Sequence, residues 1–568
     1  MSRPWLRPAA LATALVLVVP VAAGLIGTAL PALGYLPSAG AASASLDPVK
    51  ALLDAPGLGR SILLSLGTGL AATLVSLLLV MLLLAGWLDS AAFRWLRRLL
   101  APLLSVPHAA AALGLALVIA PSGFLVRLVA PLSPALSRPP DWLILQDPFG
   151  LTLTLGLVLK EVPFLLLMAL AALHQIDLRP RLQLAESFGY GRIAAFGYTV
   201  APLLYRQLRL PVLAVLAFST SVVDMALVLG PSLPATLAVR VVGWMGDPDL
   251  AIRMKGAAGA LLQLSVSAAA LLVWFAGERA IHLVWRSQAI RGNRLARDRI
   301  ASRTGLGVVL GLVVLAVLGL AVLTLWSLAT AWRYPDLLPS GLTLRHWLQS
   351  GPDLTELIAT TLAIGLAVSL AAVALVTALL QERVQGQGGG SAGLDTRLLD
   401  GLAFVPLLVP QVAFLFGLQV LFLEAGLDGS LFGVALSHFV FVLPYILLSL
   451  RGPWGALDPR YRQVALSLGA SEQRVFWRIR LPLMFPAILT AVALGLAISV
   501  SQYLPTLLIG GGRVTTVTTE AVALASGGSR PLIAVHALAQ ILLPFAGFAL
   551  AAALSRLLLP RLFSRRSS

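Results

Sequence analysis

About a dozen apolar stretches, each long enough to cross a lipid bilayer, follow one another along the 568-residue chain. A transmembrane helix needs roughly 20 consecutive apolar residues, and the short polar loops between the stretches leave no room for a large soluble domain. The sequence therefore predicts an all-α membrane protein with about 12 transmembrane helices. The predicted helices cover residues 9–35, 60–86, 99–121, 149–173, 209–231, 256–278, 305–330, 355–381, 399–423, 429–450, 485–509 and 532–558.

The composition excludes several classes of protein. Only 11% of the residues are charged and 58% are hydrophobic, whereas a soluble domain has roughly 25% charged residues. The chain has no cysteine and only six scattered histidines, which excludes disulfides and thiolate metal sites. We predict no catalytic residue, no metal site and no cofactor. A membrane-anchored enzyme is disfavoured because no Ser/His/Asp set converges in the sequence.

The glycine-rich run at residues 385–391 does not have the residues that a nucleotide-binding loop needs. It lacks the Gly-Lys-Ser/Thr ending with which a P-loop holds phosphates and Mg²⁺. We interpret it as a flexible loop between two helices. Any ATP hydrolysis is therefore expected on a separate subunit, and this chain is predicted not to be an enzyme.

The first apolar stretch admits two readings. Arg3 and Arg7 precede it and small residues at 41–45 follow it, as in a cleavable signal peptide. Its apolar part runs from residue 9 to about 36, however, much longer than the 7 to 15 apolar residues of a signal peptide. An uncleaved first helix is favoured.

The net charge of +17 follows the alternation of the loops. Of the 41 Lys and Arg residues, 29 fall on the side of the N-terminus and 11 on the other side. Basic residues collect in cytoplasmic loops, so both termini are predicted to be cytoplasmic. The arginine-rich segment 286–304 is interpreted as a linker facing anionic lipid rather than as a nucleic-acid site.

The chain contains an internal repeat. Residues 183–189 read Gln-Leu-Ala-Glu-Ser-Phe-Gly, and residues 463–469 read Gln-Val-Ala-Leu-Ser-Leu-Gly. Flanking matches pair Pro107 with Pro410 and Pro163 with Pro444. Both copies fall on the cytoplasmic side, which indicates two parallel six-helix repeats. We expect a first module at 1–285, a linker at 286–304 and a second module at 305–568.

Each repeated segment has the pattern of two short helices joined at a glycine, followed by a proline at the start of a membrane helix. Glycine permits a tight bend, and proline loses no hydrogen bond in the first turn of a helix. Small residues on the first short helix are expected to let another surface approach closely. The segments are therefore predicted to dock a cytoplasmic partner. The predicted docking residues are Gln183, Ala185, Ser187, Gly189, Phe196, Pro202, Gln463, Ala465, Ser467, Gly469, Phe476 and Pro482.

This pattern resembles the coupling-loop motif of permease subunits of binding-protein-dependent ABC importers, in which Glu-Ala-Ala is followed by Gly and later by Phe and Leu-Pro. The second copy is the closer match, with Leu468-Gly469 and Leu481-Pro482-Leu483. Gln183 and Gln463 replace the leading Glu, so neither copy offers a carboxylate there. Leu184 and Val464 replace the first Ala.

The resemblance covers nearly the whole chain and is nearest to the fused two-module permeases of iron(III) and thiamine importers. It implies the type I ABC importer permease fold, two cytoplasmic ABC ATPase subunits, a periplasmic substrate-binding protein and alternating access between the helix bundles. It also implies location in the inner membrane of a bacterium. No nucleic acid is expected as a partner.

Three charged residues fall inside predicted helices: Lys160, Glu161 and Asp224. Charges within a bilayer are costly, so these three residues are predicted to have a role. One alternative places them on the translocation path. The other has Lys160 pair with Asp224 or Glu161 and hold helices together. Adjacent residues of a helix do not face each other, so Lys160 and Glu161 are expected to have different partners. In the second module, Ser501 and Gln502 are the candidate path residues.

Two further features are interpreted as structural. The four paired prolines, Pro107, Pro163, Pro410 and Pro444, are expected to bend their helices. His438, near the start of the tenth predicted helix, is expected to act as an interfacial anchor rather than as a ligand.

The leading hypothesis is a permease subunit that passes a solute delivered by a periplasmic binding protein, with thiamine or iron(III) as candidates. The rival is a twelve-helix secondary transporter driven by an ion gradient. The duplicated loops and the scarcity of intramembrane carboxylates argue against the rival.

Overall fold

The computed structural model describes residues 8–291, 299–386 and 396–564. Within these ranges, 11 helices are long and apolar enough to cross a membrane, and a twelfth span is obtained if one sharply bent helix pair counts as one. The described ranges contain helices and no strand. The prediction of an all-α membrane protein with about twelve spans is thus confirmed.

The helices form two series that correspond element by element. In the first half these are α1 (Pro8–Ala32), α3 (Leu58–Trp87), α5 (His108–Ile119), α7 (Leu151–Leu173), α10 (Ala201–Ser221), α11 (Asp224–Leu229), α12 (Leu237–Met245) and α13 (Leu250–Ile290). In the second half they are α14 (Arg299–Leu328), α15 (Arg345–Gly386), α18 (Gln411–Glu424), α19 (Leu431–Gly455), α22 (Leu481–Val500), α23 (Leu504–Gly510), α24 (Val517–Ala525) and α25 (Arg530–Ser564).

Shorter helices complete the fold. They are α2 (Asp47–Leu53), α4 (Ala91–Leu104), α6 (Phe124–Val129), α16 (Thr396–Leu402), α17 (Val405–Leu408), and the 3-10 turns Pro37–Ala39, Ala130–Leu132 and Pro134–Leu136. The remaining ones, α8 (Leu178–Ser187), α9 (Arg192–Thr199), α20 (Pro459–Ser467), α21 (Glu472–Val475) and the π-turn η5 (Phe476–Arg480), belong to the repeated segments.

Four predicted spans are broken rather than continuous. The predicted helix 99–121 is divided between α4 and α5 just before Pro107, and the helix 399–423 is divided before Pro410 with a bend of 90°. Proline lacks an N–H group and disfavours helix in the preceding residue, which explains both breaks. The predicted helices 209–231 and 485–509 end early, at Ser221 and Val500, and resume as α11 and α23.

The other two paired prolines do not interrupt their helices. Pro163 lies inside α7 and Pro444 lies inside α19, and both helices continue through them. The prolines thus interrupt the third span of each half, whereas the fourth span of each half stays one helix.

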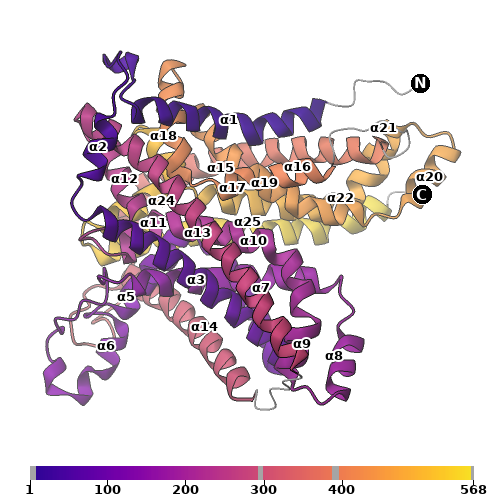
Figure 1. The fold of residues 1–568 in the computed structure, drawn as a ribbon, viewed down its shortest axis with the longest axis horizontal. Coiled ribbons are helices and arrows are strands. Elements are labelled where there is room, and N and C mark those ends of the chain that lie inside the picture. Colours follow the sequence, from indigo (N-terminus) through magenta and orange to yellow (C-terminus); the bar gives the residue numbers. More distant parts are fainter. Residues whose placement is uncertain (1–7, 292–298, 387–395, 565–568) are drawn as a thin grey trace.

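The first helix of each half packs against the other half. Helix α1 packs on α18 and α15, and α14 packs on α3 and α5. Figure 1 shows α1 along the outer edge of the second-half helices and α14 beside the first-half ones. The two sequence modules are thus interlocked in the folded protein.

Glycines permit both crossings. A Cβ at Gly417 would lie 2.0 Å from the carbonyl oxygen of Gly24, and the Gly417 N–H donates to Thr28 Oγ1 at 2.9 Å. At the corresponding crossing, a Cβ at Gly114 would lie 3.3 Å from the backbone of Gly319. Close approach of backbones at small residues is the usual way in which helices associate inside a membrane.

The start of α1 is held by the end of α15. The backbone N–H groups of Ala9 and Ala10 donate to the carboxylate of Glu382 at 3.0 and 3.1 Å. A carboxylate satisfies the unpaired donors of a helix N-terminus and complements its dipole. Glu382 therefore joins the two halves at this end of the molecule.

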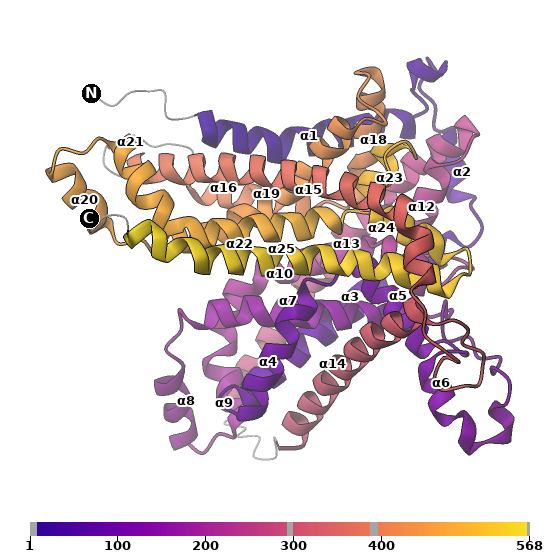
Figure 2. The ribbon, with the colours of Figure 1, turned by 180° about the vertical axis from the view of Figure 1, so that it is seen from behind.

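The repeated segments lie at one end of the molecule. In Figures 1 and 2, α8 and α9 of the first half and α20 and α21 of the second half share the end at which α1 begins and α25 finishes, whereas α6, α12 and α24 lie at the opposite end. The two halves are therefore oriented in parallel, as the repeat predicted.

Candidate functional site

The two repeated segments have the same backbone turn. In the first, the N–H of Gly189 donates to the Glu186 carbonyl at 2.9 Å and that of Tyr190 to the Ala185 carbonyl at 3.3 Å. In the second, Gly469 donates to Leu466 and Ala470 to Ala465, both at 3.0 Å. This is the Schellman arrangement that ends a helix at a left-handed residue. We refer to α8–α9 and α20–η5 below as the coupling segments.

In both turns a glycine occupies the position that requires a left-handed backbone conformation. Gly189 and Gly469 have φ values of +83° and +80°, a region that other residues enter only at a cost. Pro202 and Pro482 lie in the first turns of α10 and α22. The predicted order of short helix, glycine, short helix and proline is confirmed in both halves.

The face that the coupling segments expose differs from the predicted one. Ala185 and Ala465 are buried, 7% and 8% exposed, and face the rest of the chain. The exposed side chains are larger and apolar: Leu184 and Phe188 in the first segment, and Val464 and Leu468 in the second, with Leu468 82% exposed. The small residues therefore let α8 and α20 lie close to their own bundles, and leucine and phenylalanine project outward.

The other predicted docking residues divide between the two sides. Gln183 and Gln463 are exposed, and the exposed Ser187 and Ser467 each donate to a carbonyl of their own helix, those of Leu184 and Val464. Phe196 is fully buried. Phe476 is half-buried and packs near the Trp454 ring at 6.4 Å between centroids. The two phenylalanines thus anchor the segments from the inside.

An arginine connects each coupling segment to a long helix. Arg192 donates to the carbonyl of Ala85 on α3 at 3.1 Å and lies 3.5 Å from the Asp89 carboxylate. Arg480 donates to Gln381 on α15 at 2.9 Å. The helices α3 and α15 occupy equivalent places in the two halves. Each segment is thus bonded to the corresponding long helix of its own half.

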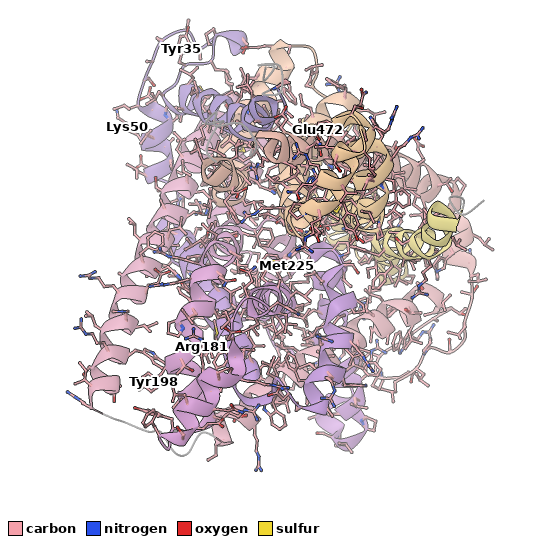
Figure 3. The ribbon with its side chains drawn as sticks, turned by 90° about the vertical axis from the view of Figure 1, so that its right-hand side faces the viewer. Tyr35, Lys50, Arg181, Tyr198, Met225 and Glu472 are labelled. Atoms are coloured by element: carbon pink, nitrogen blue, oxygen red, sulfur yellow. The ribbon has the colours of Figure 1, made fainter. Side chains whose placement is uncertain are left out.

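The coupling segments are not identical. The second contains the π-turn η5 and a charge-assisted bond between Arg462 and Glu472, which connects α20 to α21. The first has tyrosines in its turn, where Tyr190 contacts Tyr198 with the ring centroids 5.6 Å apart. Figure 3 places Arg181 and Tyr198 in one half and Glu472 in the other.

Lys160 does not pair with a carboxylate. Its ammonium donates to the carbonyls of Leu103, Leu104 and Val106, the last at 2.5 Å. These carbonyls lie at the end of α4, where the break before Pro107 leaves them without helical partners. The predicted ion pair with Asp224 or Glu161 is wrong, because the broken helix supplies a concentrated set of acceptors. Lys160 stabilises that break.

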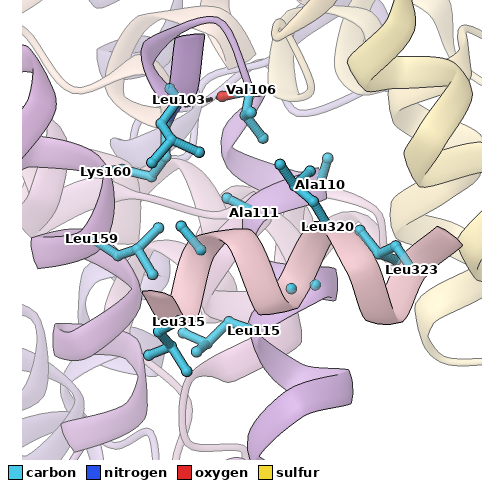
Figure 4. Close-up of a pocket in the computed structure, with 13 residues that line it drawn as sticks. Leu103, Val106, Ala110, Ala111, Leu115, Leu159, Lys160, Leu315, Leu320 and Leu323 are labelled. Atoms are coloured by element: carbon cyan, nitrogen blue, oxygen red, sulfur yellow. Dashed lines mark hydrogen bonds between the residues drawn. The ribbon is translucent and has the colours of Figure 1, made fainter. Parts of the chain in front are cut away.

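A narrow pocket lies beside Lys160, where α5, α7 and α14 meet (Figure 4). Leucines and alanines form most of its wall, together with the crossing glycines Gly114 and Gly319. Its volume of about 20 Å³ is close to the space for one water molecule. A space of this size holds no solute in this conformation, and the role of Lys160 on the translocation path stays a prediction.

Glu161 points elsewhere, as expected for the neighbour of Lys160. Its carboxylate lies 3.8 Å from Nε2 of His108, the first residue of α5. Glu161 is 4% exposed. A second carboxylate, Asp224, begins α11, is 8% exposed, and lies within electrostatic range of the same imidazole. Both predicted path carboxylates thus interact electrostatically with His108.

Two tyrosines of the second half interact electrostatically with this group. Tyr445 on α19 lies within electrostatic range of Glu161, and Tyr503 lies within electrostatic range of Asp224. Gln502 is 9% exposed and its side-chain oxygen accepts from Gln411 at 3.5 Å. Met225, next to Asp224, lies in the middle of the molecule between the halves (Figure 3). We call His108, Glu161, Asp224, Tyr445 and Tyr503 the central cluster.

The two remaining polar predictions have structural explanations. Ser501 donates to the carbonyl of Ala497 in its own helix. His438 is 1% exposed in α19, between Ser499 and Thr506 at 2.8 Å each. Thr506 donates to a backbone carbonyl, so it accepts from His438 Nε2–H, and Nδ1 accepts from Ser499. The predicted interfacial anchor is therefore wrong: His438 is a buried hydrogen-bonding residue.

Known proteins share these features. Residues 395–564 match the family described as the binding-protein-dependent transport system inner membrane component. The chain is 31% identical to the inner membrane ABC transporter permease protein YnjC of Escherichia coli over 518 residues, which cover 90% of this chain and 91% of that protein. The chain belongs to the ABC transporter permease family.

Further ABC permeases match a part of the chain. One of them is named the putative 2-aminoethylphosphonate transport system permease protein PhnV, from Salmonella typhimurium. It is 30% identical over 37% of this chain and 78% of its own length. The spermidine/putrescine permease PotC of Haemophilus influenzae is 27% identical over 26% of this chain and 56% of its own length. As an ABC permease with at least 11 membrane-spanning helices in its described part, the chain is a multi-pass inner-membrane transport subunit.

The sequence indicates both repeated segments of this ABC permease but only part of the central cluster. His108 and Gln411 directly follow the paired Pro107 and Pro410, and this position at a helix break was the signal available for them. Tyr445 and Tyr503 gave no such signal, because aromatic residues are ordinary in membrane helices. Only the folded chain shows that they lie within electrostatic range of carboxylates of the other half.

Proposed function

We propose that the chain forms the translocation pathway of an ATP-driven importer and that two cytoplasmic ATPase subunits dock on its coupling segments. The observation that carries the proposal is the duplicated segment at one end of the molecule, with Phe188 and Leu468 exposed in equivalent places. On this account, both chain termini are cytoplasmic, and a periplasmic binding protein delivers the solute at the end that carries α6, α12 and α24.

The proposed mechanism uses the arginine connections. When the ATPase subunits close on ATP, the coupling segments move with them, and Arg192 and Arg480 pass the movement to α3 and α15. The interlocked halves then rock about the central cluster, which alternately opens to either side. Binding energy that differs between the two conformations drives such a shift. The segments 1–285 and 305–568 act as the two moving modules, connected by 286–304.

The chemical identity of the solute is the finer part of the proposal. The fused architecture favours thiamine or iron(III), whereas two of the matched relatives are named for spermidine and putrescine or for 2-aminoethylphosphonate. The names of these relatives therefore do not favour thiamine or iron(III).

Purification of the full chain from its native membranes tests the proposal. We expect an ABC ATPase to co-purify at two subunits per chain, the complex to hydrolyse ATP, and solute uptake to survive an uncoupler that abolishes ion gradients. A secondary transporter would bring down no ATPase, and its uptake would collapse with the uncoupler. That result would overturn the importer assignment.

A further inference from the structure

We propose that Ser65 and Thr361 are positioning residues through which the end of the molecule opposite the coupling segments responds to ATP. Each joins a long helix, α3 or α15, to the buried start of a short helix, α12 or α24, in its own half. The inference rests on the proposed importer function and adds to it the residues that carry movement to the far end.

In each half, the first N–H group of the short helix donates to a hydroxyl of the long helix. The N–H of Leu237, the first residue of α12, donates to Ser65 Oγ at 3.0 Å. The N–H of Val517, the first residue of α24, donates to Thr361 Oγ1 at 3.1 Å. All four residues are at most 3% exposed. The first N–H groups of a helix have no partner within it, so a side chain of another helix supplies the acceptor here.

The two hydroxyls lie at the same distance along their helices from the coupling segments. The arginine of the first coupling segment bonds Ala85, twenty residues after Ser65 on α3. That of the second bonds Gln381, twenty residues after Thr361 on α15. Both helices run unbroken between these points, and a rise of 1.5 Å per residue makes each distance about 30 Å. The repeat therefore preserves a polar contact at both ends of the same length of helix.

The short helices lie where the two halves meet at the far end. Helix α12 of the first half packs on α18 of the second, and α24 of the second half packs on α5 and α11 of the first. Figures 1 and 2 show α12 and α24 at the end opposite α8 and α20. A long helix that moves with its coupling segment therefore carries its short helix along and changes the packing between the halves at that end.

The connection is stronger in the first half than in the second. Arg240 of α12 also donates to Ser61 Oγ at 3.0 Å, one turn before Ser65 on α3. In the second half, the bond to Thr361 is the one side-chain hydrogen bond between the described residues of α15 and α24. The Thr361 hydroxyl donates to the Leu357 carbonyl at 2.6 Å, which fixes its orientation and leaves a lone pair for α24. Loss of Thr361 is therefore expected to matter more than loss of Ser65.

Spin labels on the two short helices test the proposal in the purified complex of the full chain with its ATPase. The chain has no cysteine, so Gly243→Cys on α12 and Ala523→Cys on α24 place one label on each helix at an exposed position. We expect the distance between the labels, measured by double electron–electron resonance, to change when MgATP and orthovanadate trap the closed ATPase. Adding Ser65→Ala and Thr361→Val together should at least halve that change, and Thr361→Val alone should reduce it more than Ser65→Ala alone.

Matched variants separate this role from a role in folding. Thr73→Val on α3 and Thr377→Val on α15 remove buried hydroxyls that donate to carbonyls of their own helices, and both should leave the distance change intact. Thr361→Ser keeps the hydroxyl and should preserve the change that Thr361→Val loses. The yield of complex and its ATP hydrolysis should match those of the unmodified chain in every variant.

Three results would overturn the proposal. One is an undiminished distance change in the Ser65→Ala/Thr361→Val variant, and another is no distance change in the labelled chain that keeps both hydroxyls. The third is loss of the folded, ATP-hydrolysing complex in this double variant but not in Thr73→Val/Thr377→Val, because the hydroxyls would then only hold the fold together. Failure of the importer function itself would instead appear as absence of the ATPase from the purified complex.

Discussion

Replacing Gly417 with valine is expected to remove most of the protein from the membrane. A Cβ at this position would lie 2.0 Å from the Gly24 oxygen and 2.4 Å from the Thr28 nitrogen, both backbone atoms of α1. Overpacking costs about 1–3 kcal/mol where side chains can shift, and a backbone cannot shift without moving the whole helix. We expect at least a tenfold loss of folded protein, measured as the monodisperse fraction after detergent extraction.

A matched control and a graded variant accompany this prediction. Gly311 lies in α14 with no atom within 4 Å of an added Cβ, so Gly311→Val should extract like wild type. Gly114 makes the equivalent crossing with contacts no closer than 3.2 Å. Gly114→Ala should therefore be tolerated better than Gly417→Ala. Wild-type extraction of Gly417→Val would show that α1 does not cross α18 at this point.

Replacing Gly469 with valine is expected to abolish transport while leaving the protein folded in the membrane. Gly469 has a φ of +80° and no atom within 4 Å of an added Cβ, so the cost of the substitution is backbone strain alone. That strain is roughly 1–2 kcal/mol for an ordinary residue and larger for a β-branched one. It would unwind the turn that presents Leu468. Uptake and ATP hydrolysis of the purified complex measure the effect.

An asparagine variant shows whether the effect of Gly469→Val comes from the backbone conformation or from the size of the side chain. It tolerates the left-handed region better than other non-glycine residues, so Gly469→Asn should keep much of the uptake that Gly469→Val loses. The same pair at Gly189, with φ +83°, should behave in parallel. If the double variant Gly189→Val/Gly469→Val transports normally, the assignment of these turns to ATPase coupling is wrong.

The coupling segments could be predicted from sequence because local rules determine them. A glycine after a short polar helix gives the left-handed turn, and Pro202 or Pro482 begins the next helix. The orientation of the segment could not be predicted in this way. Small residues fit a docking face and a buried face equally well, and tertiary packing placed Ala185 and Ala465 inward.

The central cluster and the crossings depend on contacts between distant parts of the chain. A charge inside a helix is unusual and so indicates Glu161, whereas nothing in the sequence indicates that Tyr445 of the other half lies within electrostatic range of it. Lys160 was assigned a carboxylate because charge pairing is the usual solution. The broken helix before Pro107 offered carbonyls instead, and a continuous predicted helix at 99–121 concealed them. The closeness of Gly24 to Gly417 follows only from the interlocked arrangement of the halves.

Cysteine cross-linking tests the central claim, ATPase docking at the coupling segments, most directly. The chain has no cysteine, so Leu184→Cys or Leu468→Cys gives a unique thiol at an exposed position. Leu233→Cys, 88% exposed in the loop between α11 and α12 at the opposite end, is the control. With a cross-linker that has a maleimide at one end and a photoreactive benzophenone at the other, we predict that both coupling-segment variants cross-link to an ATPase subunit and that the control does not. An ATPase that co-purifies but is cross-linked from Leu233→Cys, or from neither coupling segment, would contradict the account.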